Sequence, residues 1–280
     1  MKPGIILGNT VSTTSSFFLA SQGKPNFYLL FITVMGAALV IGSASTFNNY
    51  IDRDIDKQME RTKYRALVCG IIRPKTAYLY ACVLLVFGII FLFQINFLTL
   101  MISITGFFIY VVIYSILMKR NSVHAILIGS LSGAMPPIIG YCAVTNNIDF
   151  GALILLCIFI FWQIPHSYAI AIFRYQDYKS ASIPIFPIKK GVFKTKINII
   201  FYIILFFIST VILFIKGYTG YKYLLISIIL NTTWLHIAIQ GFKSSETNFN
   251  ISWSKKIFFF SIITITVINF FIGIDYKKIS

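Results

Sequence analysis

Apolar residues run through this chain in long blocks separated by short polar links. Nine blocks are each close to the 20 or so residues that an α-helix needs to cross a hydrocarbon core of about 30 Å. Because a helix satisfies its backbone hydrogen bonds internally, we predict an all-α polytopic membrane protein, a single domain over residues 1–280. The predicted helices cover residues 5–22, 27–48, 76–94, 97–117, 122–143, 151–173, 197–215, 221–241 and 257–274.

The overall composition favours the same class. Hydrophobic residues make up 58% of the chain, the mean hydropathy is +0.83, and only 11% of residues are charged. Soluble domains carry roughly 25% charged residues. We therefore expect membrane lipid to surround most of the chain.

The net charge of +16 is carried by the links rather than by the apolar blocks. This distribution is typical of topology determinants, so we exclude nucleic acid as a partner. Nine crossings that begin in the cytoplasm leave five of the 24 Lys and Arg residues outside. These five are Lys24, Lys216, Lys222, Lys277 and Lys278. The bias predicts a cytoplasmic N-terminus and a C-terminus on the outer side.

The link after the second block holds four of the eight acidic residues of the chain. Asn48, Asp52, Asp56 and Glu60 recur at every fourth position, so on a helix they would share one face. A basic stripe follows the same period about 100° around the helix. Its members are Arg53, Lys57, Arg61 and Arg65. The simplest interpretation is a solvated helix extension with internal ion pairs.

The alternative interpretation of this link is a metal-diphosphate site. Mg²⁺ is typically held by one or two carboxylates together with substrate phosphates, and Asn48, Asp52 and Asp56 offer suitable oxygen atoms. The predicted topology returns Asp177 to the same membrane face as a candidate ligand for a second ion. It also returns the Lys119–Arg120 pair, which with the basic stripe could neutralise a departing diphosphate. A diphosphate above an apolar bundle implies a lipid-like substrate.

A polar patch interrupts the sixth block. Gln163 and His166 flank Pro165, which loosens the helix, and ionisable residues at membrane depth are usually functional. A hydrogen-bonded packing histidine remains the alternative. We predict that His166 belongs to a substrate pocket.

Two stretches together resemble a known family. Asn48, Asp52 and Asp56, followed by Arg61-Thr62-Lys63-x-Arg65, resemble the first signature of the UbiA-type intramembrane prenyltransferases. The run from Phe161 to Arg174, continued by Asp177-Tyr178, is similar to the branch that farnesylates protohaem IX. The second superfamily signature normally has two aspartates four residues apart. Here Phe173 and Ala181 stand four residues before and after Asp177, which puts a second metal in doubt.

The resemblance implies nine helices around a central substrate cavity in a bacterial inner membrane. It implies that Mg²⁺ is held by Asn48, Asp52, Asp56 and Asp177, and that these residues are also the catalytic ones. It further implies farnesyl diphosphate and haem B as substrates, haem O as product, and a respiratory oxidase or haem-modifying protein as candidate partner. Gln163 and His166 would contact haem or handle water. The implied diphosphate ligands are Arg61, Arg65, Lys119 and Arg120, and the basic stripe adds Arg53 and Lys57 as candidates.

Three other functions stay open at this stage. A related prenyltransferase could act on a quinone precursor or another ring acceptor. A haem transporter would place ionisable residues near mid-membrane, whereas here they cluster at one face. A structural subunit of a respiratory complex would have no need of Asn48, Asp52 and Asp56.

Overall fold

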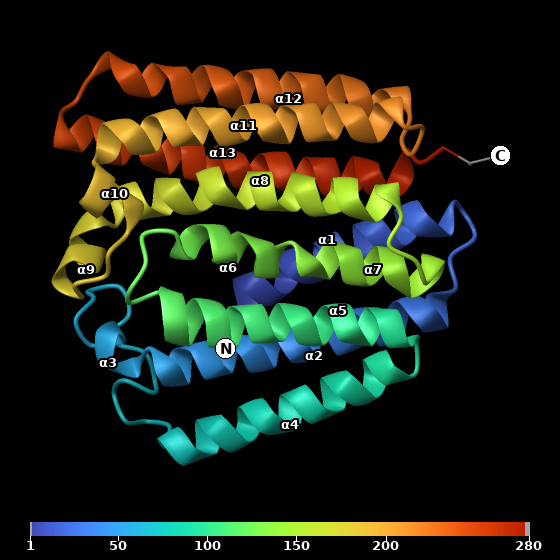
Figure 1. Cartoon of the computed structure of the whole chain (residues 1–280), viewed down its shortest axis with the longest axis horizontal. Helices are drawn as coiled ribbons and strands as arrows, with labels where there is room; N and C mark the ends of the chain where they lie inside the picture. Colours follow the sequence, from blue (N-terminus) through green and yellow to red (C-terminus); the bar gives the residue numbers. More distant parts are fainter. Residues whose placement is uncertain (1, 278–280) are drawn as a thin grey trace.

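The computed structural model describes residues 2–277, and these fold into a bundle of long helices (Figure 1). Lys278, counted above among the outer lysines, lies outside the described residues. In chain order the elements are α1 (Pro3–Ser21), α2 (Phe27–Ile51), α3 (Arg53–Asp56), α4 (Pro74–Phe93), α5 (Phe97–Phe108), the π-helix η1 (Ile109–Met118), α6 (Ala125–Gly133), α7 (Met135–Thr145), α8 (Phe150–Phe173), α9 (Tyr175–Ser180), α10 (Phe186–Lys190), α11 (Val192–Ile215), α12 (Tyr221–Ile239), the 3₁₀ turn η2 (Gln240–Lys243) and α13 (Thr247–Ile274).

The predicted all-α membrane fold is confirmed. Within residues 2–277, eight helical segments are long and apolar enough to cross a membrane. They are α2, α4, α5 with η1, α6 with α7, α8, α11, α12 with η2, and α13. All nine predicted blocks form helices. The first of them, α1, is not among the eight segments that are apolar enough to cross a membrane.

Helix α1 is less apolar because it carries a run of hydroxyl side chains. Ser12, Thr13 and Ser16 are buried, and each donates a hydrogen bond to a backbone carbonyl of the preceding turn of α1. Gly140 of α7 lies so close to α1 that an added Cβ would stand 2.0 Å from the Thr13 carbonyl oxygen. The hydroxyls therefore permit close helix packing, a common use of small residues within membranes.

Two predicted helices differ in shape from the prediction. The fourth becomes a π-helix over Ile109–Met118, a distortion that is frequent at functional sites. The fifth breaks at Ala134, between α6 and α7, because Pro136 and Pro137 have no N–H to donate to the preceding turn. The ninth helix begins at Thr247, ten residues before its predicted start at residue 257.

The short elements gather at one end of the bundle. Helices α3, α9 and α10 lie together at the left in Figure 1, although α3 is more than 100 residues from α9 in the sequence. Helix α8 runs through the middle of the bundle and packs against α6, α11 and α13. This end, the mouth of the bundle, is where the predicted acidic site lies.

Candidate active site

The three predicted ligands Asn48, Asp52 and Asp56 lie together in the wall of the mouth. Helix α2 ends at Ile51, but the Asp52 N–H still donates to the Asn48 carbonyl, and the Asp56 N–H donates to the Asp52 carbonyl. These bonds preserve the four-residue spacing across the helix end. All three residues are buried, with exposed fractions of 1–3%.

Cationic side chains from distant segments surround these buried oxygens. Lys119, at the end of the π-helix, forms an ion pair with the Asp52 Oδ2 atom. Arg65 forms an ion pair with Asp56 Oδ2. The Asn48 amide also donates to Asp52 Oδ2 at 2.8 Å, so one carboxylate oxygen receives two donors. Charge-assisted bonds of this kind are the strong ones in a protein interior.

Lys2 is a site residue that the sequence reasoning missed. Its ammonium Nζ donates to the Asn48 Oδ1 atom at 2.5 Å, across 46 residues of sequence. Burial and the nearby charges of Arg65 and Lys119 lower the pKa of Lys2 to about 7, although Asp52 and Asp56 oppose the shift. Its position in the sequence suggested only a topology signal, and only the folded chain brings it to the acids.

The predicted basic stripe does not form, because α3 ends at Asp56 and the chain continues in turns. Lys57 and Arg61 are exposed, and Arg53 lies over the ring of Tyr50 at 4.8 Å with a buried, unbonded Nη1 atom. Glu60 also leaves the acidic face and pairs with Lys63 on the surface. Of the four predicted basic positions, only Arg65 contacts an acidic ligand candidate.

Arg120 lies at the mouth but contacts a different acid from its neighbour Lys119. Its guanidinium grips both oxygens of Asp54 at 2.7 Å and also donates to the Ile51 carbonyl. This guanidinium holds the pKa of the Asp54 carboxyl below its usual range. The exposed pair fastens the loop after η1 to α3.

The π-helix turns a polar strip toward the acids. Ser115 accepts a hydrogen bond from the Asn48 amide at 3.0 Å and donates its own hydroxyl to the Tyr110 carbonyl. Tyr110 and Tyr114 stack with ring centroids 5.5 Å apart. The wider register of the π-helix, in which the Lys119 N–H donates to the Tyr114 carbonyl, aims Lys119 at Asp52.

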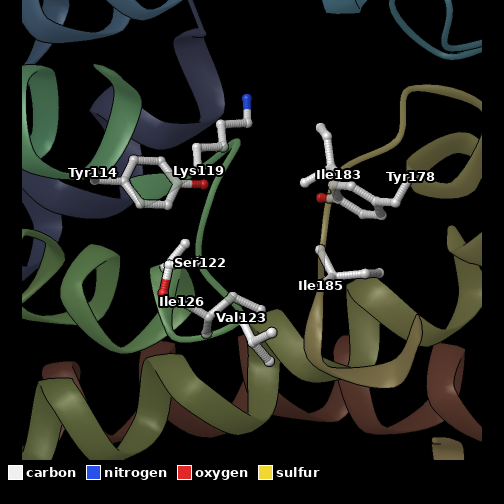
Figure 2. Close-up of a pocket in the computed structure, with 9 residues that line it drawn as sticks. Tyr114, Lys119, Ser122, Val123, Ile126, Tyr178, Ile183 and Ile185 are labelled. Carbon is white, nitrogen blue, oxygen red and sulfur yellow. The ribbon is translucent and has the colours of Figure 1, made fainter. Parts of the chain in front are cut away.

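A small cavity of about 30 Å³ adjoins Lys119. Figure 2 shows the hydroxyl groups of Tyr114 and Tyr178 pointing toward each other from opposite walls. Polar groups line the part nearest Lys119, and the remainder of the wall is mostly apolar. The lining residues are Tyr114, Lys119, Ser122, Val123, Ala125, Ile126, Tyr178, Ile183 and Ile185.

Asp177 precedes the tyrosine of the opposite wall. Its carboxylate lies 3.9 Å from the Arg174 guanidinium, and its side chain is only 12% exposed. Asp177 therefore reaches the mouth, as the topology predicted, but from another wall.

The segment after Asp177 closes over the mouth through apolar contacts. Ile183 and Ile185 are buried in a small cluster with Ile55 and Met59 of the acidic link. The Ser180 hydroxyl adds a 2.8 Å hydrogen bond to the Gln58 carbonyl. The two walls therefore hold each other in place.

The predicted pocket residues Gln163 and His166 lie deeper, within α8. The Gln163 amide rests directly over Gly133 at the break between α6 and α7, where an added Cβ would lie 1.9 Å from Gln163 Oε1. His166 faces α13, where its Nδ1 atom lies 2.7 Å from the Ser261 hydroxyl. Neither residue contacts the acids at the mouth.

The residues at the mouth fit a magnesium ion that is held jointly with a substrate. The Asp52 Oδ1 atom and the Asn49 Oδ1 atom are buried without a hydrogen-bond partner, and unsatisfied buried oxygens are costly unless a ligand uses them. Within residues 2–277, no three His, Cys, Asp or Glu side chains gather closely enough to hold a metal by themselves. A metal at Asp52 would therefore need substrate phosphate oxygens and water to complete its ligands, as Mg²⁺ typically does.

Comparison with known proteins identifies the family. Residues 9–263 match the UbiA prenyltransferase family over most of the chain. The chain belongs to the UbiA prenyltransferase family. Among its relatives, the protoheme IX farnesyltransferase of Wigglesworthia glossinidia brevipalpis is 62% identical over 278 residues, which cover 99% of this chain and 96% of that protein. The enzyme of the same name from Yersinia pseudotuberculosis serotype O:1b is 51% identical over 99% of this chain and 93% of its own length.

Solved structures of the UbiA fold agree with the helix arrangement. A digeranylgeranylglyceryl phosphate synthase superposes with a TM-score of 0.78 at 16% identity, covering 95% of this chain and 93% of that one. A UbiA homologue from Archaeoglobus fulgidus, bound to GPP and Mg²⁺, superposes with a TM-score of 0.71 at 15% identity, covering 96% of each chain. At these identities the likeness shows the fold alone.

Proposed function

We propose that this UbiA prenyltransferase transfers the farnesyl group of farnesyl diphosphate to a vinyl group of haem B, with addition of water, to give haem O and diphosphate. Two observations support this activity. Buried acidic side chains lie beside three cationic ones at one end of an apolar bundle, and these cations are Lys2, Arg65 and Lys119. The chain is also 62% identical to a protein named protoheme IX farnesyltransferase.

The mouth would receive the diphosphate with its metal. Asp52, Asp56 and Asn48 would hold Mg²⁺, with Asp177 approaching from the opposite wall. Bound there, Mg²⁺ would supply electrostatic stabilisation of the negative charge on the leaving diphosphate. Lys2, Arg65 and Lys119 would turn from the acidic site to the phosphate oxygens, because carboxylate and phosphate oxygens accept the same charge-assisted hydrogen bonds.

The reaction begins when the C1–O bond of farnesyl diphosphate breaks and its electron pair leaves with the diphosphate. Lys2, Arg65 and Lys119, turned from the acids to the phosphate oxygens, stabilise that departing charge. The π electrons of the haem vinyl group then form the new bond to C1. Water adds to the resulting cation next to the macrocycle and loses a proton, which leaves a hydroxyethylfarnesyl side chain.

The aromatic walls suit a substrate whose reacting carbon becomes cationic. Tyr114 and Tyr178 line the cavity beside Lys119, and aromatic faces attract cations. The apolar side chains of Ile126, Ile183 and Ile185 continue the wall and suit the start of a prenyl chain. The tail would extend among the helices.

We further infer that the mouth faces the cytoplasm. The basic links fall at this end of the bundle, as the positive-inside rule requires. The N-terminus would then be cytoplasmic and the C-terminus outside, in a bacterial inner membrane. A respiratory oxidase or a haem-modifying enzyme would be the natural recipient of the product.

The activity can be tested with purified protein in lipid nanodiscs. Incubation with haem B, farnesyl diphosphate and Mg²⁺ should yield a farnesylated haem that chromatography and mass spectrometry identify. A parallel reaction should offer a quinone precursor as acceptor. If the quinone precursor is prenylated and haem B is left unchanged, the acceptor is a quinone precursor and not haem B.

A further inference from the structure

Ser261 of α13 is the centre of a polar junction inside the bundle. Its hydroxyl lies 2.6 Å from the Phe258 carbonyl oxygen and 2.7 Å from His166 Nδ1. Its own carbonyl accepts a 2.8 Å hydrogen bond from the Trp162 indole N–H. One residue therefore contacts two side chains of α8, which stand one helical turn apart.

These contacts decide which nitrogen of His166 carries the proton. A carbonyl oxygen can only accept, so the 2.6 Å contact uses the single hydroxyl proton of Ser261. The Ser261 oxygen must then accept from His166, whose Nδ1 atom is the donor. In the neutral imidazole this leaves a lone pair on Nε2.

Two aromatic side chains contact the imidazole ring. The imidazole stacks on Trp162 with centroids 5.0 Å apart, and Phe258 covers it with centroids 4.8 Å apart. Within residues 2–277, Nε2 of His166 makes no hydrogen bond and no acidic side chain pairs with the ring. The side chain is nevertheless only half-buried.

The absence of a counter-ion favours one role for this lone pair. A proton acceptor would become an unpaired imidazolium within the membrane, which is costly. Coordination of a metal uses the neutral ring without adding a proton, and imidazole is a common axial ligand of haem iron. Proteins usually orient such a ligand by giving its other ring N–H a hydrogen-bond acceptor, and the Ser261 hydroxyl takes that position here.

We propose that His166 Nε2 binds the iron of the acceptor haem, and that Ser261 is the positioning residue that fixes the required tautomer. This inference rests on the proposed function, because it takes haem B as the acceptor. His166 lies eight residues before Arg174, about 12 Å deeper than the mouth at the rise of an α-helix. Iron held at that depth leaves the rim of the macrocycle free to approach the diphosphate end.

Resonance Raman spectroscopy of the full chain in nanodiscs, loaded with haem B and reduced, tests the ligand. Wild type should show an iron–histidine stretching band, His166→Gly should lose it, and added imidazole should restore it. Ser261→Ala should shift the band to lower frequency by removing the Nδ1 acceptor, and Ser261→Thr should return it toward the wild-type position.

Ser254→Ala is the matched control. Ser254 lies two turns earlier on α13, is buried, and donates to the Ile251 carbonyl at 3.0 Å in the same way, without a histidine contact. It should leave the band unchanged. A wild-type band in His166→Gly, or an equal shift in both serine variants, would overturn the proposal.

The Raman spectrum and the product assay test the iron ligand and the proposed function independently. Wild type that farnesylates haem while His166→Gly keeps the band would contradict the ligand alone. Wild type that shows the band but forms no farnesylated haem would contradict the proposed function. If His166→Gly does not fold, the Ser261 variants decide the question, because they retain the imidazole.

Discussion

Replacing Asp52 by Asn tests the metal-diphosphate site most directly. The change keeps the size of the side chain but removes the charge from a buried carboxylate, of which Oδ1 has no partner and Oδ2 pairs with Lys119. Removal of one preorganised electrostatic group typically costs about 10²–10³-fold in kcat. We expect a loss of farnesyl transfer of at least that size, together with a higher Mg²⁺ requirement.

Asp54→Asn is the matched control, because Asp54 lies two residues away and also pairs with a basic residue. The side chains of Asp54 and Arg120 are 58% and 36% exposed, and exposed pairs contribute at most about 1 kcal/mol. A change of that size corresponds to no more than about fivefold in rate. The two substitutions should therefore differ by more than an order of magnitude.

Loss of folding must be separated from loss of chemistry. Asp52→Asn leaves the Lys119 ammonium, only 15% exposed, without its carboxylate, and an unpaired buried charge costs about 3–5 kcal/mol. The double variant Asp52→Asn with Lys119→Met removes both charges, so its thermal unfolding midpoint should lie nearer to wild type. Activity should remain lost. Wild-type turnover by the single Asp52 variant at limiting Mg²⁺ would refute the assignment.

Three further predictions concern the metal, the N-terminal lysine and helix packing. Removal of Mg²⁺ with EDTA should abolish product formation and its return should restore it, whereas full turnover in EDTA would contradict metal dependence. Lys2→Met should raise the KM for farnesyl diphosphate about tenfold or more by removing a charge-assisted contact. Lys63→Met, whose ammonium pairs with the exposed Glu60, should change KM little. Gly140→Ala should lower the thermal unfolding midpoint, because its Cβ would meet the Thr13 carbonyl and overpacking costs about 1–3 kcal/mol. The control Gly8→Ala should leave the midpoint unchanged, because its Cβ would meet nothing within 4 Å.

Local sequence was sufficient to predict the helices and the acidic wall of the site. Long apolar blocks identify membrane spans because the bilayer imposes a length and an internal hydrogen-bond requirement on each segment. Asn48, Asp52 and Asp56 keep their four-residue spacing past the end of α2, because backbone hydrogen bonds still join each of them to the next. The apolar blocks and this spacing could both be predicted because each depends only on residues that are near neighbours in the sequence. The same spacing was misleading for Lys57 and Glu60, because the chain leaves the helix after Asp56.

Tertiary structure alone decided which cations meet which acids. Lys2 and Lys119 reach Asn48 and Asp52 across 46 and 67 residues of sequence, and no local pattern ranks them above the other basic residues. The same holds for Ser261, which meets His166 across 95 residues. The sequence by itself therefore determined the membrane fold, the family resemblance and the acidic wall. Packing decided the charge pairing and the deep histidine, because those contacts join helices whose relative positions no single helix encodes.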